Sequence, residues 1–210
     1  MQRATKALRV GKIDCTAGFA AALCVLRLVA ESGVCVAFLA AAVAHEAGHL
    51  LTLRLLGAEI SSVRLGFLDA RIGTNTLGYR EEAVCALAGP AASVLFCLLF
   101  RKVAPTFAAI SLLLGLFNAL LVFPLDGGRA LRAGLGLILP LETAQKVCWI
   151  VSAAFLAAGL AAALLGAWNY GLGLGPVFVW STVLVRVACY AGEEGLAIEG
   201  HVGYNTKDYE

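Results

Sequence analysis

Long apolar runs recur along this chain, separated by short polar connections. A helix that crosses the hydrocarbon core of a bilayer needs about 20 mostly apolar residues. Six stretches meet or approach that length, at residues 13–30, 34–56, 83–100, 107–124, 146–167 and 172–190. Only Glu31, Ser32 and Gly33 separate the first two, which are therefore expected to form a tight helical hairpin. The pattern predicts an all-α polytopic membrane protein with about six transmembrane helices.

The longest connection, residues 57–82, has a different pattern. Val63, Leu65 and Phe67 alternate with Arg64 and Gly66, which is the period of two typical of a strand. A short β-hairpin at the membrane surface fits this alternation. An ordinary cytoplasmic loop with one amphipathic turn fits it equally well, so periodicity leaves both interpretations open.

The composition agrees with a membrane protein. Of the 210 residues, 60% are apolar and 14% are charged, whereas a soluble domain is nearer half apolar and a quarter charged. The net charge of +2 gives no indication of nucleic-acid binding. The seven cysteines are odd in number and irregularly spaced, and no CxxC occurs. We expect free thiols packed between helices, without a disulfide framework or a cysteine metal cluster.

The basic residues predict the orientation. Residues 13–30 are too long for the apolar part of a signal peptide, and more apolar runs follow, so a retained first helix is expected. With the N-terminus inside, the outer connections hold only Arg101 and Lys102. The inner segments hold Arg3, Lys6, Arg9, Lys12, Arg64, Arg71, Arg80, Arg129, Arg132 and Lys207. The excess of inner basic residues places both termini in the cytoplasm of a multi-pass cell-membrane protein.

A polar cluster interrupts the second apolar run. HEAGH places His45 and His49 four residues apart, and therefore on one face of a helix. Two neutral imidazoles at this spacing can bind Zn²⁺, while Glu46 lies beside the metal as a general base. This is the HExxH arrangement of zinc proteases.

A five-residue motif also occurs by chance. The membrane setting argues against chance here, because a charged residue near the centre of a span costs roughly 2.5–3.5 kcal/mol on insertion. Metal binding and catalysis give a reason for three polar residues in one turn, whereas packing against lipid does not. The small residues around the motif would let neighbouring helices approach closely; they are Ala41, Ala42, Ala44, Ala47 and Gly48.

A catalytic zinc site commonly has three protein ligands and one open position. The third histidine, His201, is in the polar tail, so a carboxylate is the natural candidate. Asp126 follows Pro124, which cannot continue a helix smoothly, and precedes two glycines. Irregular backbone at membrane depth is tolerated where it lines protein or a water-filled cavity. Asp126 could therefore supply a ligand carboxylate. Taken alone, PLDGGR is also typical of an ordinary turn at the cytoplasmic surface, in which Asp126 would cap the turn.

Asn118 lies eight residues before Asp126, inside the fourth apolar run. Its amide could bond substrate backbone or an oxyanion, or simply bond a neighbouring helix. Arg129 is interpreted as a cytoplasmic surface charge.

Together, HEAGH at 45–49 and NALLVFPLDGG at 118–128 resemble the motifs of the site-2 protease family of intramembrane metalloproteases. The closer likeness is to the stage IV sporulation protein FB type, whose second motif ends in PLDGGR. The resemblance covers roughly residues 34–132, the expected core, including LAGPAAS at 87–93 as the family's glycine-proline motif. It implies zinc ligands at His45, His49 and Asp126. It also implies a catalytic base at Glu46 and a substrate contact at Asn118.

The resemblance has departures as well as matches. Leu121 stands where the family often has proline, and Ser93 stands where asparagine is common, which leaves substrate handling open. The family often carries a PDZ or CBS domain, and this chain has no room for either. We expect a minimal enzyme, one transmembrane metalloprotease domain over residues 1–190, and a short cytoplasmic tail over 191–210. The family's membrane-surface β-hairpin favours a hairpin within 57–82.

The implied function is zinc-dependent intramembrane endopeptidase activity. The expected partners are the lipid bilayer, regulatory membrane proteins and a membrane-tethered protein substrate, with no nucleic acid. Cleavage near or within the bilayer would release a cytoplasmic factor, by resemblance a pro-sigma factor in regulated intramembrane proteolysis during sporulation. A membrane metal-binding or transport protein is the alternative, but the outer halves of the spans offer few polar residues to pass an ion. A catalytically inactive homologue is the other alternative, and the intact set of ligands and base argues against it.

Overall fold

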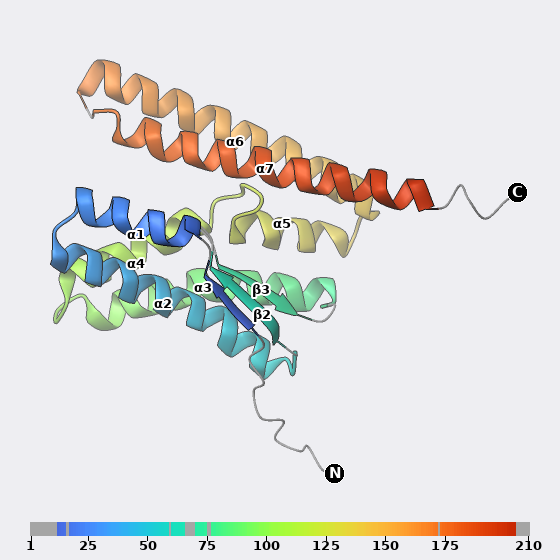
Figure 1. The fold of residues 1–210 in the computed structure, drawn as a ribbon, viewed down its shortest axis with the longest axis horizontal. Coiled ribbons are helices and arrows are strands. Elements are labelled where there is room, and N and C mark those ends of the chain that lie inside the picture. Colours follow the sequence, from blue (N-terminus) through green and yellow to red (C-terminus); the bar gives the residue numbers. More distant parts are fainter. Residues whose placement is uncertain are drawn as a thin grey trace, which may run out of the picture.

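A computed structural model describes residues 12–15, 17–58, 60–65, 70–74, 77–171 and 173–204. Over these residues the chain forms seven helices and one three-stranded sheet (Figure 1). In chain order the elements are β1 (Lys12–Cys15), α1 (Ala17–Val29), α2 (Ser32–Leu55), β2 (Ile60–Leu65), β3 (Ala70–Thr74), α3 (Tyr79–Phe100), α4 (Pro105–Asn118), α5 (Asp126–Gly136), α6 (Leu141–Tyr170) and α7 (Gly175–Tyr204).

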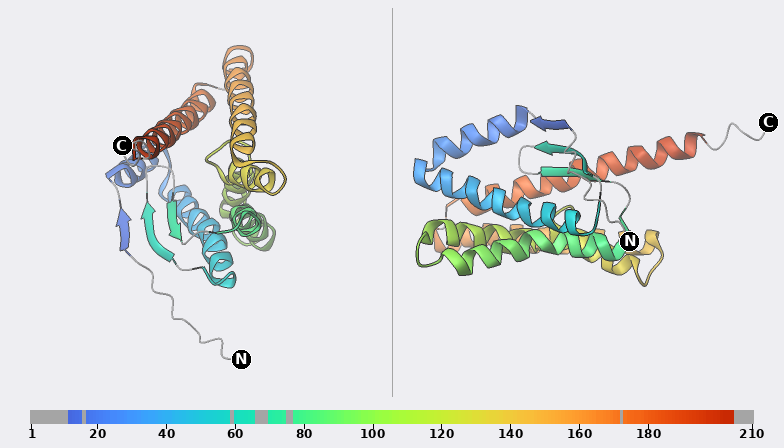
Figure 2. Two further views of the ribbon diagram at one scale, coloured as in Figure 1. Left: turned by 90° about the vertical axis from the view of Figure 1, so that its right-hand side faces the viewer. Right: turned by 90° about the horizontal axis from the view of Figure 1, so that it is seen from below.

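Helix α3 is the centre of the helical packing, because it contacts α2, α4 and α5. Helices α6 and α7 pack against each other and lie beyond α5, away from α2 (Figures 1 and 2). A buried apolar cluster joins this pair to the segment that precedes α5. It consists of Val122, Leu125, Leu156, Val183 and Val187. Helices α2 and α5, which are distant in sequence, both pack against α3.

Three helices are long and apolar enough to cross a membrane, namely α2, α3 and α6. Many of their large apolar side chains face outward, including Leu51, Leu99 and Ile150 at 59–69% exposure. Such a surface is expected where lipid replaces water, and the chain is a membrane protein by this criterion. A total of six crossings stays a prediction, because the other apolar helices are shorter: α4, and the Gly175–Tyr190 part of α7.

The prediction of a helix from residue 13 was wrong. Residues Lys12–Cys15 form strand β1, which pairs in parallel with β2, for example Ile13 with Val63. Helix α1 has 13 residues and is roughly 20 Å long at about 1.5 Å per residue. That is shorter than a hydrocarbon core of about 30 Å. A short apolar run does not distinguish helix from strand, and the strand's partner lies about fifty residues further along the chain.

The connection expected to hold a hairpin contains β2 and β3. These strands pair antiparallel, with Val63 opposite Ile72 and Arg64 opposite Arg71. The sheet order is β1-β2-β3. The location of this sheet at a membrane surface stays a prediction.

Two predicted helix ends also differ from the structure. Helix α4 ends at Asn118, not at residue 124, because the apolar residues that follow are used for packing in an irregular segment. Val122 and Phe123 are buried there, and the Phe123 N–H donates to Ser152 Oγ on α6 at 2.9 Å. Helix α7 continues to Tyr204, beyond the expected end at residue 190. Polar composition made residues 191–204 look like a tail, but alanine, leucine and glutamate there are good helix formers.

Candidate metal centre

Helix α2 presents both histidines of the HExxH motif on its buried face. The buried residues of this helix are Cys35, Ala41, His45, His49 and Leu53, mostly four apart. The exposure of His45 is 3% and that of His49 is 5%. Their ring centroids lie 5.1 Å apart. The predicted spacing therefore places the two imidazoles together inside the protein.

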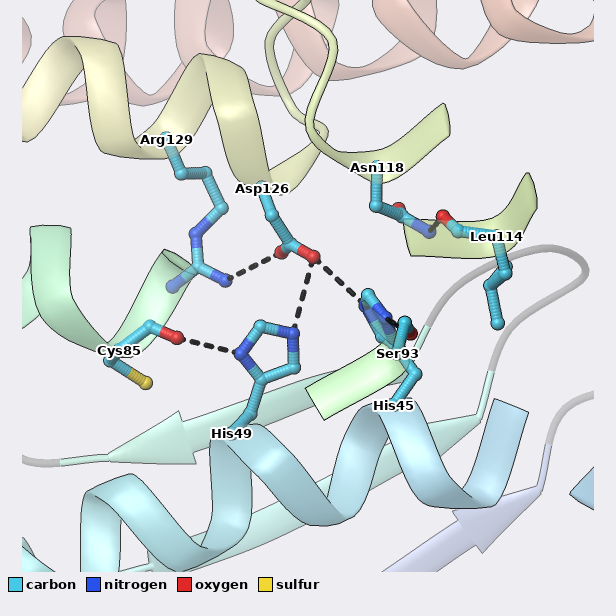
Figure 3. A network of polar contacts seen from close by, with 8 residues as sticks. All are labelled: His45, His49, Cys85, Ser93, Leu114, Asn118, Asp126 and Arg129. Atoms are coloured by element: carbon cyan, nitrogen blue, oxygen red, sulfur yellow. Dashed lines mark hydrogen bonds and ion pairs between the residues drawn. The ribbon is translucent and has the colours of Figure 1, made fainter. Parts of the chain in front are cut away.

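Asp126 meets the histidines from the other side of the site. It is the first residue of α5 and is 8% exposed. Its Oδ2 lies 3.0 Å from His45 Nε2 and 3.2 Å from His49 Nε2, as the dashed lines in Figure 3 show. The start of a helix is a favourable place for a carboxylate, because the backbone N–H groups there carry partial positive charge. Residues that are 81 positions apart thus converge on one point.

The geometry of these three groups fits a zinc ion. One ligand atom from each residue lies within 4.8 Å of the others. A tetrahedral ion with bonds of about 2.0–2.2 Å holds its ligand atoms roughly 3.3 Å apart. The two nitrogen–oxygen distances, 3.0 and 3.2 Å, are close to that value. Two nitrogens and one carboxylate oxygen leave the fourth position free, as in catalytic zinc sites.

Helix α3 holds the outer nitrogen of each imidazole. His49 Nδ1 donates to the Cys85 backbone oxygen at 2.8 Å, since a carbonyl can only accept. His45 Nδ1 lies 2.9 Å from Ser93 Oγ. Metal-binding histidines commonly donate their second ring N–H in this way, which directs the other nitrogen toward the metal. Neither contact could be predicted from the sequence, because both depend on how α3 is rotated against α2. Ser93 stood out only as a departure from the family's usual asparagine.

Glycine lets α3 come close enough to make these contacts. A Cβ built at Gly89 would collide with His49 Nε2 and would lie 2.7 Å from His45 Nε2. At Gly48 on α2, an added Cβ would lie 2.6 Å from the Ala88 backbone oxygen. The two helices therefore approach backbone to backbone at the site, as small residues allow in membrane helix pairs.

The remaining predicted residues have different surroundings. Glu46 is half-buried and interacts electrostatically with both histidines and with Asp126. Asn118 donates from Nδ2 to the Leu114 backbone oxygen at 3.0 Å within its own helix, so its substrate contact stays a prediction. Arg129 was interpreted as a surface charge. Its Nη1 lies 3.8 Å from Asp126 Oδ1, so it also pairs with the candidate ligand (Figure 3).

Comparison with known proteins found one similar fold and two similar sequences. A solved site-2 protease from Methanocaldococcus jannaschii superposes with a TM-score of 0.62 over 84% of this chain and 88% of that one, at 22% sequence identity. The fold is that of a site-2 protease. Two curated sequences from strains of Mycobacterium tuberculosis, both named "Putative zinc metalloprotease Rip3", are 34% identical over 123 residues. No family model matches the chain.

The site-2 protease fold extends over most of the chain, whereas the curated relatives match only part of it. Their alignment covers 49% of this chain and 30% of the relative's own length. The chain thus spans less than a third of those proteins. Both comparisons therefore match the chain to proteins named as proteases, one by fold and the other by a partial sequence alignment.

Proposed function

We propose that this protein is a zinc-dependent intramembrane endopeptidase of the site-2 protease family. The observation that carries the proposal is the buried convergence of His45 Nε2, His49 Nε2 and Asp126 Oδ2. Two of these groups lie on a helix long and apolar enough to cross a membrane. A structural ion pair alone would not need two imidazoles directed at one carboxylate oxygen.

In this proposal His45, His49 and Asp126 hold the zinc ion. When bound, Zn²⁺ supplies Lewis acidity that makes water a better nucleophile near neutral pH and polarises the scissile carbonyl. Glu46 accepts a proton from the attacking water as the oxygen bonds to the carbonyl carbon. It then passes that proton to the amide nitrogen as the C–N bond breaks. Asn118 uses one Nδ2 hydrogen on Leu114, and its second hydrogen is available to bond substrate.

The site lies toward one end of α2. His49 is six residues before Leu55, which is roughly 9 Å along the helix axis, and the basic Arg54 is in the last turn. Basic residues favour the cytoplasmic side, so water would reach the site from the cytoplasm. Both chain termini are proposed to lie on that same side.

The substrate class follows from this position. A site near the cytoplasmic surface suits a membrane-tethered protein cut near or within the bilayer, with release of a cytoplasmic factor. The PLDGGR segment resembles the stage IV sporulation protein FB type, which favours a pro-sigma factor as that product and sporulation as the process. Regulatory membrane proteins are proposed as further partners.

The Glu46→Gln variant tests the catalytic assignment. Glutamine keeps the shape of glutamate but cannot accept the proton, so cleavage of a co-expressed membrane-tethered substrate should fall about 10²–10⁴-fold. Zinc content should stay at that of the parent. Substrate cleavage is followed by immunoblotting, and zinc is measured by elemental analysis of the purified protein.

The matched control is Glu31→Gln, an exposed acid at the other end of α2 that makes no capping hydrogen bond. It should cleave like the parent. Cleavage by Glu46→Gln at the parental rate would overturn the assignment of the base. A parent that binds zinc without cutting any tethered substrate would identify an inactive homologue, and zinc transport without cleavage would identify a transporter.

A further inference from the structure

Ser93 is the only side chain seen to bond the outer nitrogen of either histidine in the described part of the chain. It lies on α3, is fully buried at 0% exposure, and places Oγ 2.9 Å from His45 Nδ1. Figure 3 shows it on the far side of His45 from Asp126. The residue that departs from the family's usual asparagine therefore contacts a candidate zinc ligand directly.

We propose that Ser93 is a positioning residue that decides which nitrogen His45 presents to the metal, and so sets the affinity of the site for zinc. The inference rests on the proposed function, since it assumes that His45 is a ligand. It adds a residue to which neither the motif nor the comparisons assign a role.

The two histidines differ in how their tautomer is fixed. The carbonyl of Cys85 can only accept, so it keeps a hydrogen on His49 Nδ1. The Ser93 hydroxyl can accept from His45 Nδ1 or donate to it. With zinc bound, it accepts, and His45 Nε2 has a free lone pair for the metal. Without zinc, the hydroxyl can donate instead, and Nε2–H can bond Asp126 Oδ2 at the observed 3.0 Å.

Packing makes Ser93 hard to replace in this role. Because the residue has no exposed surface, water cannot take over the hydrogen bond if the hydroxyl is removed. Helix α4 also presses directly on it. A Cβ built at Gly115 would lie 2.7 Å from Ser93 Cβ, so the serine has little freedom to move away from His45. Without the Ser93 hydroxyl, His45 would keep an unpaired Nδ1–H. Alternatively, its hydrogen would move to Nε2, which would then have no lone pair for the metal.

The test compares Ser93→Ala with Ser111→Ala. Ser111 lies on α4 and is also 0% exposed, but its Oγ has no hydrogen-bond partner among the described residues. Both changes remove one buried oxygen. Competition with a chromophoric chelator in detergent should show zinc affinity about 10–100-fold weaker for Ser93→Ala. Zinc affinity should stay at the parental value for Ser111→Ala.

A spectroscopic readout separates positioning from general loosening of the fold. The visible absorption bands of bound Co²⁺ report the number and arrangement of ligands. We expect altered bands for Ser93→Ala and parental bands for Ser111→Ala and for Ser152→Ala. Ser152 is equally buried but bonds the Phe123 N–H and the Cys148 backbone oxygen, away from the histidines. The Ser93→Ala side chain is smaller than serine, so crowding does not block folding.

Two results overturn the proposal. One is parental zinc affinity and parental Co²⁺ bands in Ser93→Ala. The other is equal loss of affinity in Ser111→Ala. If the parent binds zinc and only the Ser93 result fails, the proposed function stands without this residue. A parent that binds no zinc overturns the proposed function and this inference together.

Discussion

At the scale of single residues, Asp126 decides whether the HExxH motif is a metal site. His45 and His49 come from one turn of one helix, and such a pair can be placed by helical spacing alone. Asp126 comes from another helix, and its Oδ2 is within hydrogen-bonding distance of both imidazoles. The carboxylate thus completes a candidate three-ligand set that the histidines cannot make alone.

Removal of this carboxylate should abolish tight zinc binding. For Asp126→Ala we expect zinc affinity at least about 100-fold weaker, a larger loss than for a residue that acts through a ligand. The matched control is Glu142→Ala, because Glu142 is an exposed acid in the first turn of α6 and should leave the affinity unchanged. Isothermal titration of the purified, metal-free protein gives both values. Equal affinity in Asp126→Ala and the parent would show that Asp126 is not a ligand.

The sequence alone could predict the three candidate ligands that the structure brings together, but not the groups that contact the outer nitrogens of the histidines. HEAGH and PLDGG carry their own signal in spacing and in resemblance. The Cys85 carbonyl carries none, and Ser93 stood out only as a departure from the family's asparagine. Neither contact could be predicted, since any residue along α3 could face α2 until the rotation of the helix is known. Asn118 illustrates the reverse case. Its polar side chain inside an apolar run predicted a substrate contact, whereas the structure shows one bond to Leu114 one turn earlier, so the substrate contact stays a prediction.

At the scale of elements, the apolar runs predicted α2, α3 and α6 well because each is long enough for a membrane crossing and is regular throughout. The helix predictions from the first and fourth apolar runs were less accurate. In the first, β1 depends on a partner strand far along the chain. In the fourth, residues 119–125 are apolar because they pack beneath α6 and α7, and hydropathy cannot distinguish that role from membrane insertion.

The close approach of α3 to α2 makes Gly89→Ala a severe change. The new Cβ would occupy the space of the His49 imidazole, so either the helices separate or the rings rotate away from Asp126. Both responses should weaken zinc binding by more than about 10-fold, because the contacts of α3 with the outer nitrogens of the histidines are displaced together with the candidate ligands. Chelator competition measures the affinity, and circular dichroism reports whether helix content is retained.

Gly134→Ala is the matched control for this experiment. Gly134 lies within α5, and a Cβ there would meet no atom within 4 Å. Alanine is favoured over glycine inside a helix by roughly 0.8–1.0 kcal/mol, so this variant should be as stable as the parent or more stable. If Gly89→Ala also kept parental zinc affinity, α3 would not approach the histidines as closely as the structure indicates.

At the scale of the whole molecule, the candidate site joins α2 and α5, which are distant in the sequence and both pack against α3. Helix α2 would supply two ligands, and α5 would supply the third while also carrying the connection to α6 and α7. Helix α3 packs against both of these helices and contacts the outer nitrogens of both imidazoles. A metal ion at this point would link α2 to α5 across about eighty residues of sequence.

Such a link predicts that zinc stabilises the entire fold. A ligand that binds only the folded state adds about 2.7 kcal/mol at a free concentration of 100 times its Kd. For a chain of this size that corresponds to a rise in Tm of roughly 5–10 °C. Thermal unfolding of the detergent-solubilised protein, followed by tryptophan fluorescence, should therefore shift downward after treatment with a chelator and recover when zinc is restored.

The control for metal removal is the Asp126→Ala variant, because a chain without the third ligand should show little change in Tm on chelation. Trp149 and Trp180 pack against the cluster that joins α6 and α7 to α5, so their fluorescence reports on that part of the molecule. A parental Tm that is insensitive to the chelator, in protein shown to contain zinc beforehand, would contradict a structural link. That result would mean that loss of the metal leaves the arrangement of α2 and α5 unchanged.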